Sequence, residues 1–140
     1  MRQIIVIGGG LAGLVASILL SRKGFQIKLF ERKKYPFHRV CGEYISNEVR
    51  PFLKENGLFP DIATADISKF QLTSVNGKTA HMPLDLGGFG VSRYALDHFL
   101  AGEALDSGVD IIHEKVTDLS FQKDDFEIRT DKGEYEAGIV

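Results

Sequence analysis

The sequence lacks the features that would indicate a disulfide-rich, membrane-spanning or polyanion-binding protein. It has one cysteine, Cys41, so no internal disulfide can form, which fits a reducing compartment. Lysine and arginine total 17 against 19 acidic residues, and the net charge of −2 argues against a nucleic-acid partner. The apolar stretch from Ile4 to Leu20 follows Arg2 as in a signal peptide, but glycines interrupt it and no cleavage site follows. No unbroken run of about 18 apolar residues occurs elsewhere. We therefore expect a cytoplasmic protein without a transmembrane segment.

Motifs for metal-dependent or nucleophilic catalysis are also missing. The four histidines, His38, His81, His98 and His113, are scattered without metal-ligand spacing. Neither C-x-x-C, H-E-x-x-H nor a Ser-His-Asp order occurs. We interpret the histidines as structural residues, expect no metal site, and identify no side chain as a catalytic acid or base.

The first 31 residues carry the strongest pattern in the chain. Arg2 to Ile7 is rich in β-branched apolar residues and predicts a buried strand. Gly8 to Gly13 follows at once and matches G-x-G-x-x-G. Leu14 to Lys23 predicts a helix, Phe25 to Phe30 a second strand, and Glu31 lies 18 residues after the last glycine of the motif. A glycine motif between a strand and a helix, with an acid at this spacing, predicts a dinucleotide-binding site.

Each part of this motif has a physical role. Gly8 allows the tight turn, Gly10 lets a diphosphate approach the backbone, and Gly13 lets the helix lie close to the sheet. The helix start offers unpaired N–H groups and a partial positive charge to the diphosphate. Glu31 can accept hydrogen bonds from both ribose hydroxyls, and its charge repels a 2′-phosphate, so NADP is not expected in this site.

Further elements follow along the chain. The pattern predicts a loop from Arg32 to Gly42, followed by a helix that is capped by Ser46 and ends near Asn56. It then predicts a hairpin of Ile67 to Val75 and Lys78 to Met82, a glycine-rich loop from Pro83 to Gly90, and a helix from Arg93 to Ser107. A strand from Val109 to Ile112 and three further strands, Lys115 to Phe121, Phe126 to Thr130 and Tyr135 to Val140, complete the chain. The predicted fold class is α/β: a Rossmann-like domain with a parallel sheet, an antiparallel three-stranded meander and an inserted β-hairpin.

Several residues in these segments allow two interpretations. Arg39 is either part of a solvated basic loop or a bidentate partner of the diphosphate. Arg93 begins a helix, where the dipole disfavours a cation, so it either serves a ligand or is simply exposed. The glycine-rich loop from Pro83 to Gly90 is either a connector or a wall near a ligand. Cys41 either faces a flavin or is a small buried residue.

The order of these parts resembles the N-terminal FAD-binding region of the glutathione-reductase-like flavoproteins. The resemblance rests on the fingerprint ending in Glu31, on Arg39-Val40-Cys41-Gly42-Glu43 before a helix, on Ser92-Arg93-Tyr94-Ala95-Leu96-Asp97 opening a second helix, and on the meander. Within this class the chain is most similar to the geranylgeranyl reductase group, which includes electron-transfer-flavoprotein-dehydrogenase-like proteins. The segment Cys41-Gly42-Glu43 favours that group over the p-hydroxybenzoate hydroxylase-like monooxygenases and the flavin-dependent halogenases.

The resemblance implies a set of FAD-binding residues. These are Gly8, Gly10, Leu11, Ala12 and Gly13 at the diphosphate, Glu31 at the adenosine ribose with Arg32 beside it, Arg39 along the diphosphate or ribityl chain, Gly42 on the flavin side, Arg93 at the ribityl or phosphate groups, and the backbone of Val116 at the adenine edge. It also implies that the hairpin at 67–82 begins a substrate domain, and that a Gly-Asp segment for the ribityl chain follows the final strand. The apolar end at Ile139-Val140 likewise predicts that residues 1–140 are an N-terminal piece of a longer flavoprotein and are inactive alone.

The expected function is therefore FAD binding in a flavin-dependent oxidoreductase, in which the flavin carries the redox chemistry. A reductase of the geranylgeranyl reductase type, acting on a small-molecule or lipid-like substrate with NAD(P)H as a transient electron donor, is the first expectation. An aromatic hydroxylase-like monooxygenase and a halogenase are the alternatives. An NAD-binding dehydrogenase domain and a non-enzymatic nucleotide-binding module are the alternatives from other classes.

Overall fold

The computed structural model describes residues 3–140, which divide into two compact units. The first unit comprises the described residues through Phe37 together with Asp97–Val140, and the second comprises His38–Leu96. Arg2, the first residue of the predicted N-terminal strand, lies outside the described residues. No helix within residues 3–140 is long and apolar enough to cross a membrane.

The first unit is built on the predicted parallel sheet. Strands β1 (Gln3–Ile7), β2 (Gln26–Phe30) and β6 (Asp110–Ile112) pair in parallel in the order β1-β2-β6. Ile139 forms a parallel bridge to Ile4, and the Ile5 N–H donates to the Ile139 carbonyl over 3.0 Å. Chain segments thus flank β1 on both edges, and Ile4 and Ile5 in its middle are buried, whereas Ile7 at its end is exposed.

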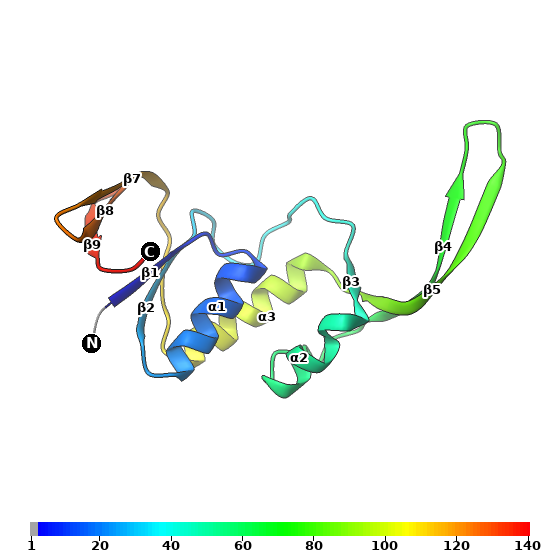
Figure 1. Cartoon of the computed structure of the whole chain (residues 1–140), viewed down its shortest axis with the longest axis horizontal. Coiled ribbons are helices and arrows are strands. Elements are labelled where there is room, and N and C mark those ends of the chain that lie inside the picture. The colour runs from blue at the N-terminus through cyan, green and yellow to red at the C-terminus, as the bar shows by residue number, and fades with distance from the viewer. Residues whose placement is uncertain (1–2) are drawn as a thin grey trace. The chain divides into compact units, whose positions relative to one another are not determined.

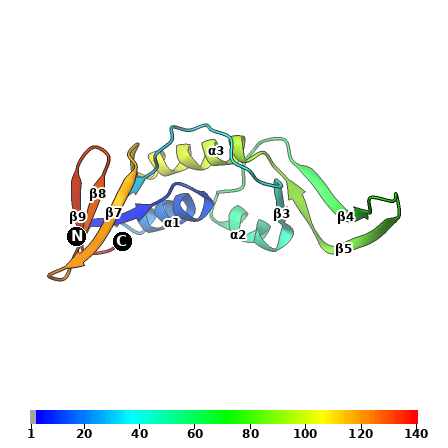
Figure 2. The same ribbon diagram turned by 90° about the horizontal axis from the view of Figure 1, so that it is seen from above.

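Two helices accompany this sheet. Helices α1 (Leu11–Arg22) and α3 (Arg93–Asp106) lie side by side in both views (Figures 1 and 2). The Ser21 hydroxyl donates to the Ser107 carbonyl over 2.6 Å, and Arg22 pairs with Glu103 at 3.0 Å. Leu14 and Ile18 on α1 are fully buried. The predicted glycine stops are confirmed, because α1 and α3 are followed by Gly24 and Gly108 at φ of +88° and +86°.

The predicted meander is also confirmed. Strands β7 (Val116–Gln122), β8 (Asp125–Thr130) and β9 (Glu134–Ala137) form an antiparallel sheet in this order. Ile128 and Ala137 of the meander form a buried cluster with Ile5 and Phe30 of the parallel sheet. The meander therefore closes the core over β1 and β2. Its third strand ends at Ala137 rather than Val140, because the chain then turns so that Ile139 can bridge β1.

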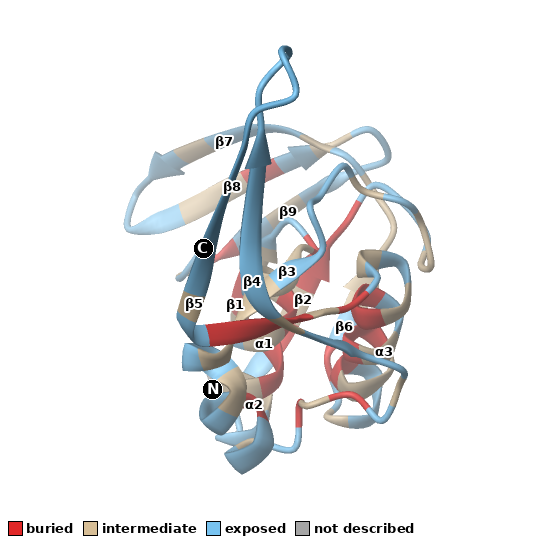
Figure 3. Cartoon of the chain, turned by 90° about the vertical axis from the view of Figure 1, so that its right-hand side faces the viewer, coloured by how far each residue is buried: buried red, intermediate tan, exposed pale blue. Residues whose placement is uncertain are grey.

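The second unit contains the predicted hairpin and two short helical segments. Strand β3 (Tyr44–Ser46) is followed by a 3₁₀ turn, η1 (Asn47–Val49), and by α2 (Arg50–Glu55). Strands β4 (Ala65–Thr73) and β5 (Thr79–Gly90) form the hairpin, and the sheet order is β3-β5-β4. Figure 3 shows the hairpin almost wholly exposed, with buried residues confined to the end of β5 at Gly87, Gly88 and Phe89.

The prediction of a loop from Pro83 to Gly90 is wrong, because these residues belong to β5. Gly88 pairs with Ser46 on one side and with Ile67 on the other. A side chain at Gly88 would strike the Tyr44 ring and would lie 2.6 Å from the Ile45 carbonyl oxygen, so glycine marks close strand packing here. Pro83 is tolerated because it lies opposite Lys69, next to the register shift in β4.

The predicted helix from Ser46 to Asn56 is correct in place but shorter than expected. The Ser46 hydroxyl accepts a hydrogen bond from the Glu48 N–H at 3.3 Å, which confirms the predicted cap. The first turn is 3₁₀, and the α-helix itself starts only at Arg50 with Pro51 in its first turn. Strand β3 was not predicted, since three residues are too few to show an alternating pattern.

Candidate dinucleotide-binding site

The glycine turn joins β1 to α1 and leaves three backbone donors at the helix start. The Gly8 N–H donates to the Phe30 carbonyl over 2.8 Å, and Gly8 has φ of +101°, as a tight turn out of the strand requires. Helix α1 begins at Leu11, three residues earlier than the predicted Leu14, with Gly10 as N-cap and a first hydrogen bond from the Leu14 N–H to the Gly10 carbonyl at 2.9 Å. The N–H groups of Leu11, Ala12 and Gly13 therefore have no partner within the helix.

Space around the turn differs from one glycine to the next. A side chain at Gly13 would collide with the Gly8 carbonyl oxygen, so the close packing of helix on turn requires glycine. A side chain at Gly10 would meet nothing within 4 Å. The turn is therefore closely packed against helix α1 at Gly13 and open at Gly10, where a diphosphate is predicted to approach.

Glu31 lies directly against this turn. Its side chain is only 7% exposed. One carboxylate oxygen accepts a hydrogen bond from the Gly9 N–H at 3.2 Å, and the other accepts from the Lys33 N–H at 3.0 Å. The Glu31 N–H in turn donates to the Ile112 carbonyl over 3.0 Å, so the end of β2 is fixed by β6. The structure thus brings together the turn and the acid that sequence spacing linked.

Tyr35 is a residue of this site that sequence reasoning missed. Its hydroxyl donates to the Gly9 carbonyl over 2.6 Å, although the sequence places it in a basic loop with no regular pattern. Its ring packs against Phe37 at 5.4 Å and edge-on to His113 at 6.3 Å. An aromatic residue before a proline, a few positions after the acid, is the only sequence signal that could have suggested it.

The other predicted residues are distributed over both units. Arg32 is exposed beside Glu31, and Val116 is half-buried at the start of β7, both in the first unit. Arg39, Gly42 and Arg93 belong to the second unit, where the Arg93 N–H donates to the Glu43 carboxylate over 3.2 Å. Their roles toward a cofactor stay predictions.

Two further expectations about single residues have different outcomes. Cys41 is exposed, so its interpretation as a small buried residue is wrong; the surrounding loop places it outside any core. His113 has its Nδ1 atom 3.3 Å from the Glu31 carbonyl, which agrees with a structural role. No group of histidine, cysteine, aspartate and glutamate side chains within residues 3–140 could hold a metal ion.

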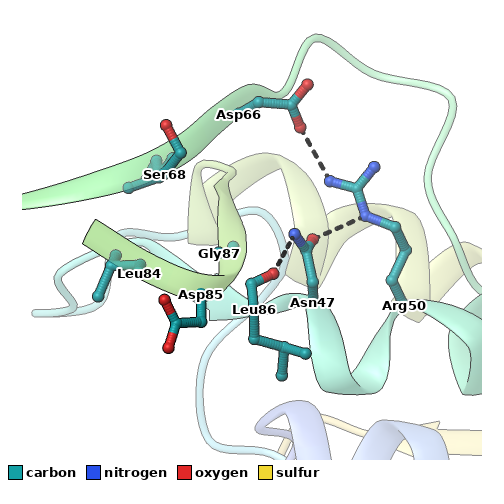
Figure 4. A pocket seen from close by; sticks show the side chains of 10 residues that line it. Asn47, Arg50, Asp66, Ser68, Leu84, Asp85, Leu86 and Gly87 are labelled. Atoms are coloured by element: carbon teal, nitrogen blue, oxygen red, sulfur yellow. Dashed lines mark hydrogen bonds and ion pairs between the residues drawn. The ribbon is translucent and has the colours of Figure 1, made fainter.

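The second unit contains a pocket of about 380 Å³ at the base of the hairpin (Figure 4). Arg50 organises one wall of it: Nε donates to the Asn47 side chain at 2.9 Å, and a terminal nitrogen pairs with Asp66 at 3.0 Å. The guanidinium also lies over the ring of the buried Phe89 at 4.9 Å. Asp85 lines the same pocket. The Arg50 guanidinium, with its bonds and its stacking, therefore stabilises the base of the hairpin.

Replacing Arg50 by lysine is expected to lower the free energy of unfolding of the second unit by about 1 kcal/mol. The pair with Asp66 contributes little because Asp66 is largely exposed, so most of the loss comes from the Asn47 bond and the stacking on Phe89. Hydrogen exchange of the β5 amides measures the change. Arg129→Lys is the matched control, since Arg129 pairs only with exposed carboxylates in the first unit. Equal protection of β5 in both variants would contradict the role given to Arg50.

Comparison with known proteins agrees with this geometry. Residues 6–52 match the model of the NAD(P)-binding Rossmann-like domain. The chain is 31% identical over 134 residues to the flavin-dependent halogenase armH4 of Armillaria mellea, and the match covers 85% of this chain and 25% of that protein. The chain thus spans about a quarter of the length of this relative.

Solved structures share the fold over nearly the whole chain. A flavoprotein/dehydrogenase from Cytophaga hutchinsonii is 27% identical with a TM-score of 0.75, over 97% of this chain and 37% of that one. The halogenase PltM, solved in complex with phloroglucinol and FAD, is 20% identical with a TM-score of 0.75, over 98% of this chain and 33% of that one.

Together, the sheet order, the glycine turn and these matches define the fold. The chain has a Rossmann-like FAD/NAD(P)-binding fold, which it shares with flavin-dependent halogenases and with the flavoprotein/dehydrogenase of known structure. FAD is the cofactor that the comparisons support, and the family model is also consistent with NAD(P).

Proposed function

We propose that this chain is the FAD-binding part of a flavin-dependent oxidoreductase that acts on a small-molecule substrate. The observation that carries the proposal is the contact between the buried Glu31 carboxylate and the Gly9 N–H, at the foot of a turn that is open at Gly10. This arrangement offers a diphosphate the unpaired helix donors and offers a ribose a fixed acceptor. When bound, FAD supplies the redox chemistry, and the chain supplies binding and orientation.

The predicted residues divide between the two halves of the cofactor in this proposal. Gly8, Gly10, Leu11, Ala12, Gly13, Glu31, Arg32 and Val116 hold the adenosine diphosphate half from the first unit. Arg39, Gly42 and Arg93 are proposed to serve the diphosphate, ribityl and flavin side. The adenosine half is supported by contacts within one unit, which makes it testable with fragments of the cofactor.

Titration with FAD tests the proposed function. Purified protein is expected to bind FAD, seen as quenching of flavin fluorescence and a perturbed flavin absorption band. ADP should compete with FAD, since it carries the diphosphate and ribose that the first unit recognises. NADP should compete far less than NAD, because the Glu31 carboxylate repels a 2′-phosphate. The proposal would be contradicted if the protein bound NAD but did not bind FAD, or if ADP did not displace bound FAD.

Two reaction types compete within this function. The flavoprotein/dehydrogenase of known structure and the Cys41-Gly42-Glu43 segment favour a reductase of the geranylgeranyl reductase type, with NAD(P)H as electron donor and a lipid-like substrate. The armH4 relative favours a halogenase, with an aromatic substrate such as the phloroglucinol bound by PltM. The complete gene product, loaded with flavin, reduced with NAD(P)H and supplied with an aromatic acceptor, halide and oxygen, should give a halogenated product in the second case and none in the first.

A further inference from the structure

We propose that Tyr35 is a positioning residue that fixes the peptide between Gly9 and Gly10 in the orientation needed for the diphosphate. This inference rests on the proposed function, because it assigns a role in the same site. It adds a residue outside the glycine motif, from the loop that follows β2. The polar groups of Gly9 on both sides of its α-carbon are held by side chains: Glu31 binds its N–H and Tyr35 binds its carbonyl.

The planarity of the peptide unit gives this contact its consequence. The carbonyl of Gly9 and the N–H of Gly10 belong to one trans peptide, so they point in opposite directions. With the carbonyl held by the Tyr35 hydroxyl at 2.6 Å, the Gly10 N–H is directed away from Tyr35. If this peptide flipped, a carbonyl oxygen would replace the N–H on the side opposite Tyr35 and would repel an anion there. The Tyr35 hydroxyl therefore disfavours the flipped turn.

The same contact explains a glycine that the motif does not require. G-x-G-x-x-G allows any residue at its second position, which is Gly9 here. A side chain at Gly9 would collide with the Tyr35 hydroxyl and would lie 2.9 Å from the Glu31 side chain. Gly9 thus allows both side chains to reach the turn at once. Neither sequence spacing nor the motif predicts this dependence.

Tyr35 is itself held in place by neighbours of the first unit. Its ring contacts the Phe37 ring at 5.4 Å and the His113 ring at 6.3 Å between centroids, and the His113 Nδ1 atom lies 3.3 Å from the Glu31 carbonyl oxygen. The loop after β2 is therefore tied to the end of β6. A tyrosine placed this way loses little freedom when it bonds to Gly9, so its hydroxyl is suited to hold the peptide.

Tyr35→Phe tests the inference with two ligands that differ in their phosphates. ADP carries the diphosphate, and adenosine lacks it but carries the same ribose and base. The variant is expected to weaken ADP binding by about three- to tenfold, the loss of one hydrogen bond, and to leave adenosine binding unchanged. NMR titration measures both dissociation constants. A purely structural role for Tyr35 would lower both affinities alike, which would overturn the proposal.

Tyr135→Phe is the matched control. Tyr135 lies in the same unit, and its hydroxyl also makes one hydrogen bond, to Glu114 at 3.1 Å. This variant should leave both affinities unchanged. ADP binding that is identical in wild type and Tyr35→Phe would overturn the inference and leave the proposed function intact. Wild-type protein that binds neither ADP nor FAD would overturn the proposed function itself.

Discussion

Alanine at Gly13 is expected to destabilise the first unit and to weaken FAD binding at least about tenfold, because the added methyl group meets backbone rather than a movable side chain. The atom it meets is the Gly8 carbonyl oxygen. Gly8 cannot move aside easily, since its N–H is bonded to Phe30 and its φ of +101° is already suited only to glycine.

Two effects of this substitution on the free energy of unfolding oppose each other, and the larger one decides whether the protein is stabilised or destabilised. Alanine favours a helix over glycine by about 1 kcal/mol, which stabilises α1. Forcing a methyl group into a packed site costs about 1–3 kcal/mol and more where backbone must shift. We therefore expect a net loss of free energy of unfolding, measured by urea denaturation, together with the loss of FAD affinity.

Gly10→Ala is the control for this prediction. A methyl group at Gly10 meets nothing within 4 Å, so the only expected loss of free energy of unfolding is that of alanine as a poorer N-cap than glycine, up to about 1 kcal/mol. FAD affinity should still fall, since the diphosphate is expected to approach the backbone at this position. If Gly13→Ala kept full stability, or Gly10→Ala kept full affinity, the assignment of these two glycines would be wrong.

The sequence predicted the parts of the site that depend on local spacing. The glycine turn and the acid that follows β2 are close because β1 and β2 are parallel neighbours, and the 18 positions from Gly13 to Glu31 hold only the rest of α1, one turn and β2 itself. The glycine stops after α1 and α3 were predictable for the same reason. Each follows from the few residues around it, without knowledge of the rest of the fold.

The features that the sequence did not predict depend on contacts between distant residues. Tyr35 meets Gly9 across 26 positions, and nothing in a basic loop indicates which of its residues turns back to the sheet. The segment from Pro83 to Gly90 has the composition of a loop, but pairing with β3 and β4 on its two sides makes it a strand. Composition reports local preference, and here the tertiary pairing overrides it.

Glu31→Gln is expected to lower the free energy of unfolding of the first unit. It is also expected to reduce the preference of the site for a ribose without a 2′-phosphate. The buried carboxylate accepts from two backbone donors, Gly9 and Lys33, with one oxygen each. An amide has one oxygen and an NH₂ group, so it can satisfy only one of them. An N–H left unpaired in this buried place costs about 1–3 kcal/mol, which urea denaturation detects.

The ligand preference of the same variant provides a second, independent measurement. With the charge removed, the affinity for 2′-phospho-ADP-ribose should rise relative to the affinity for ADP-ribose, because no carboxylate repels the extra phosphate. Glu114→Gln is the matched control: its carboxylate also lies in the first unit and accepts from the Thr130 and Tyr135 hydroxyls at 2.6 and 3.1 Å. That variant should leave the ratio of the two affinities unchanged. An unchanged ratio in Glu31→Gln as well would show that Glu31 does not face the ribose, since a carboxylate beside the 2′ position must act on a phosphate there.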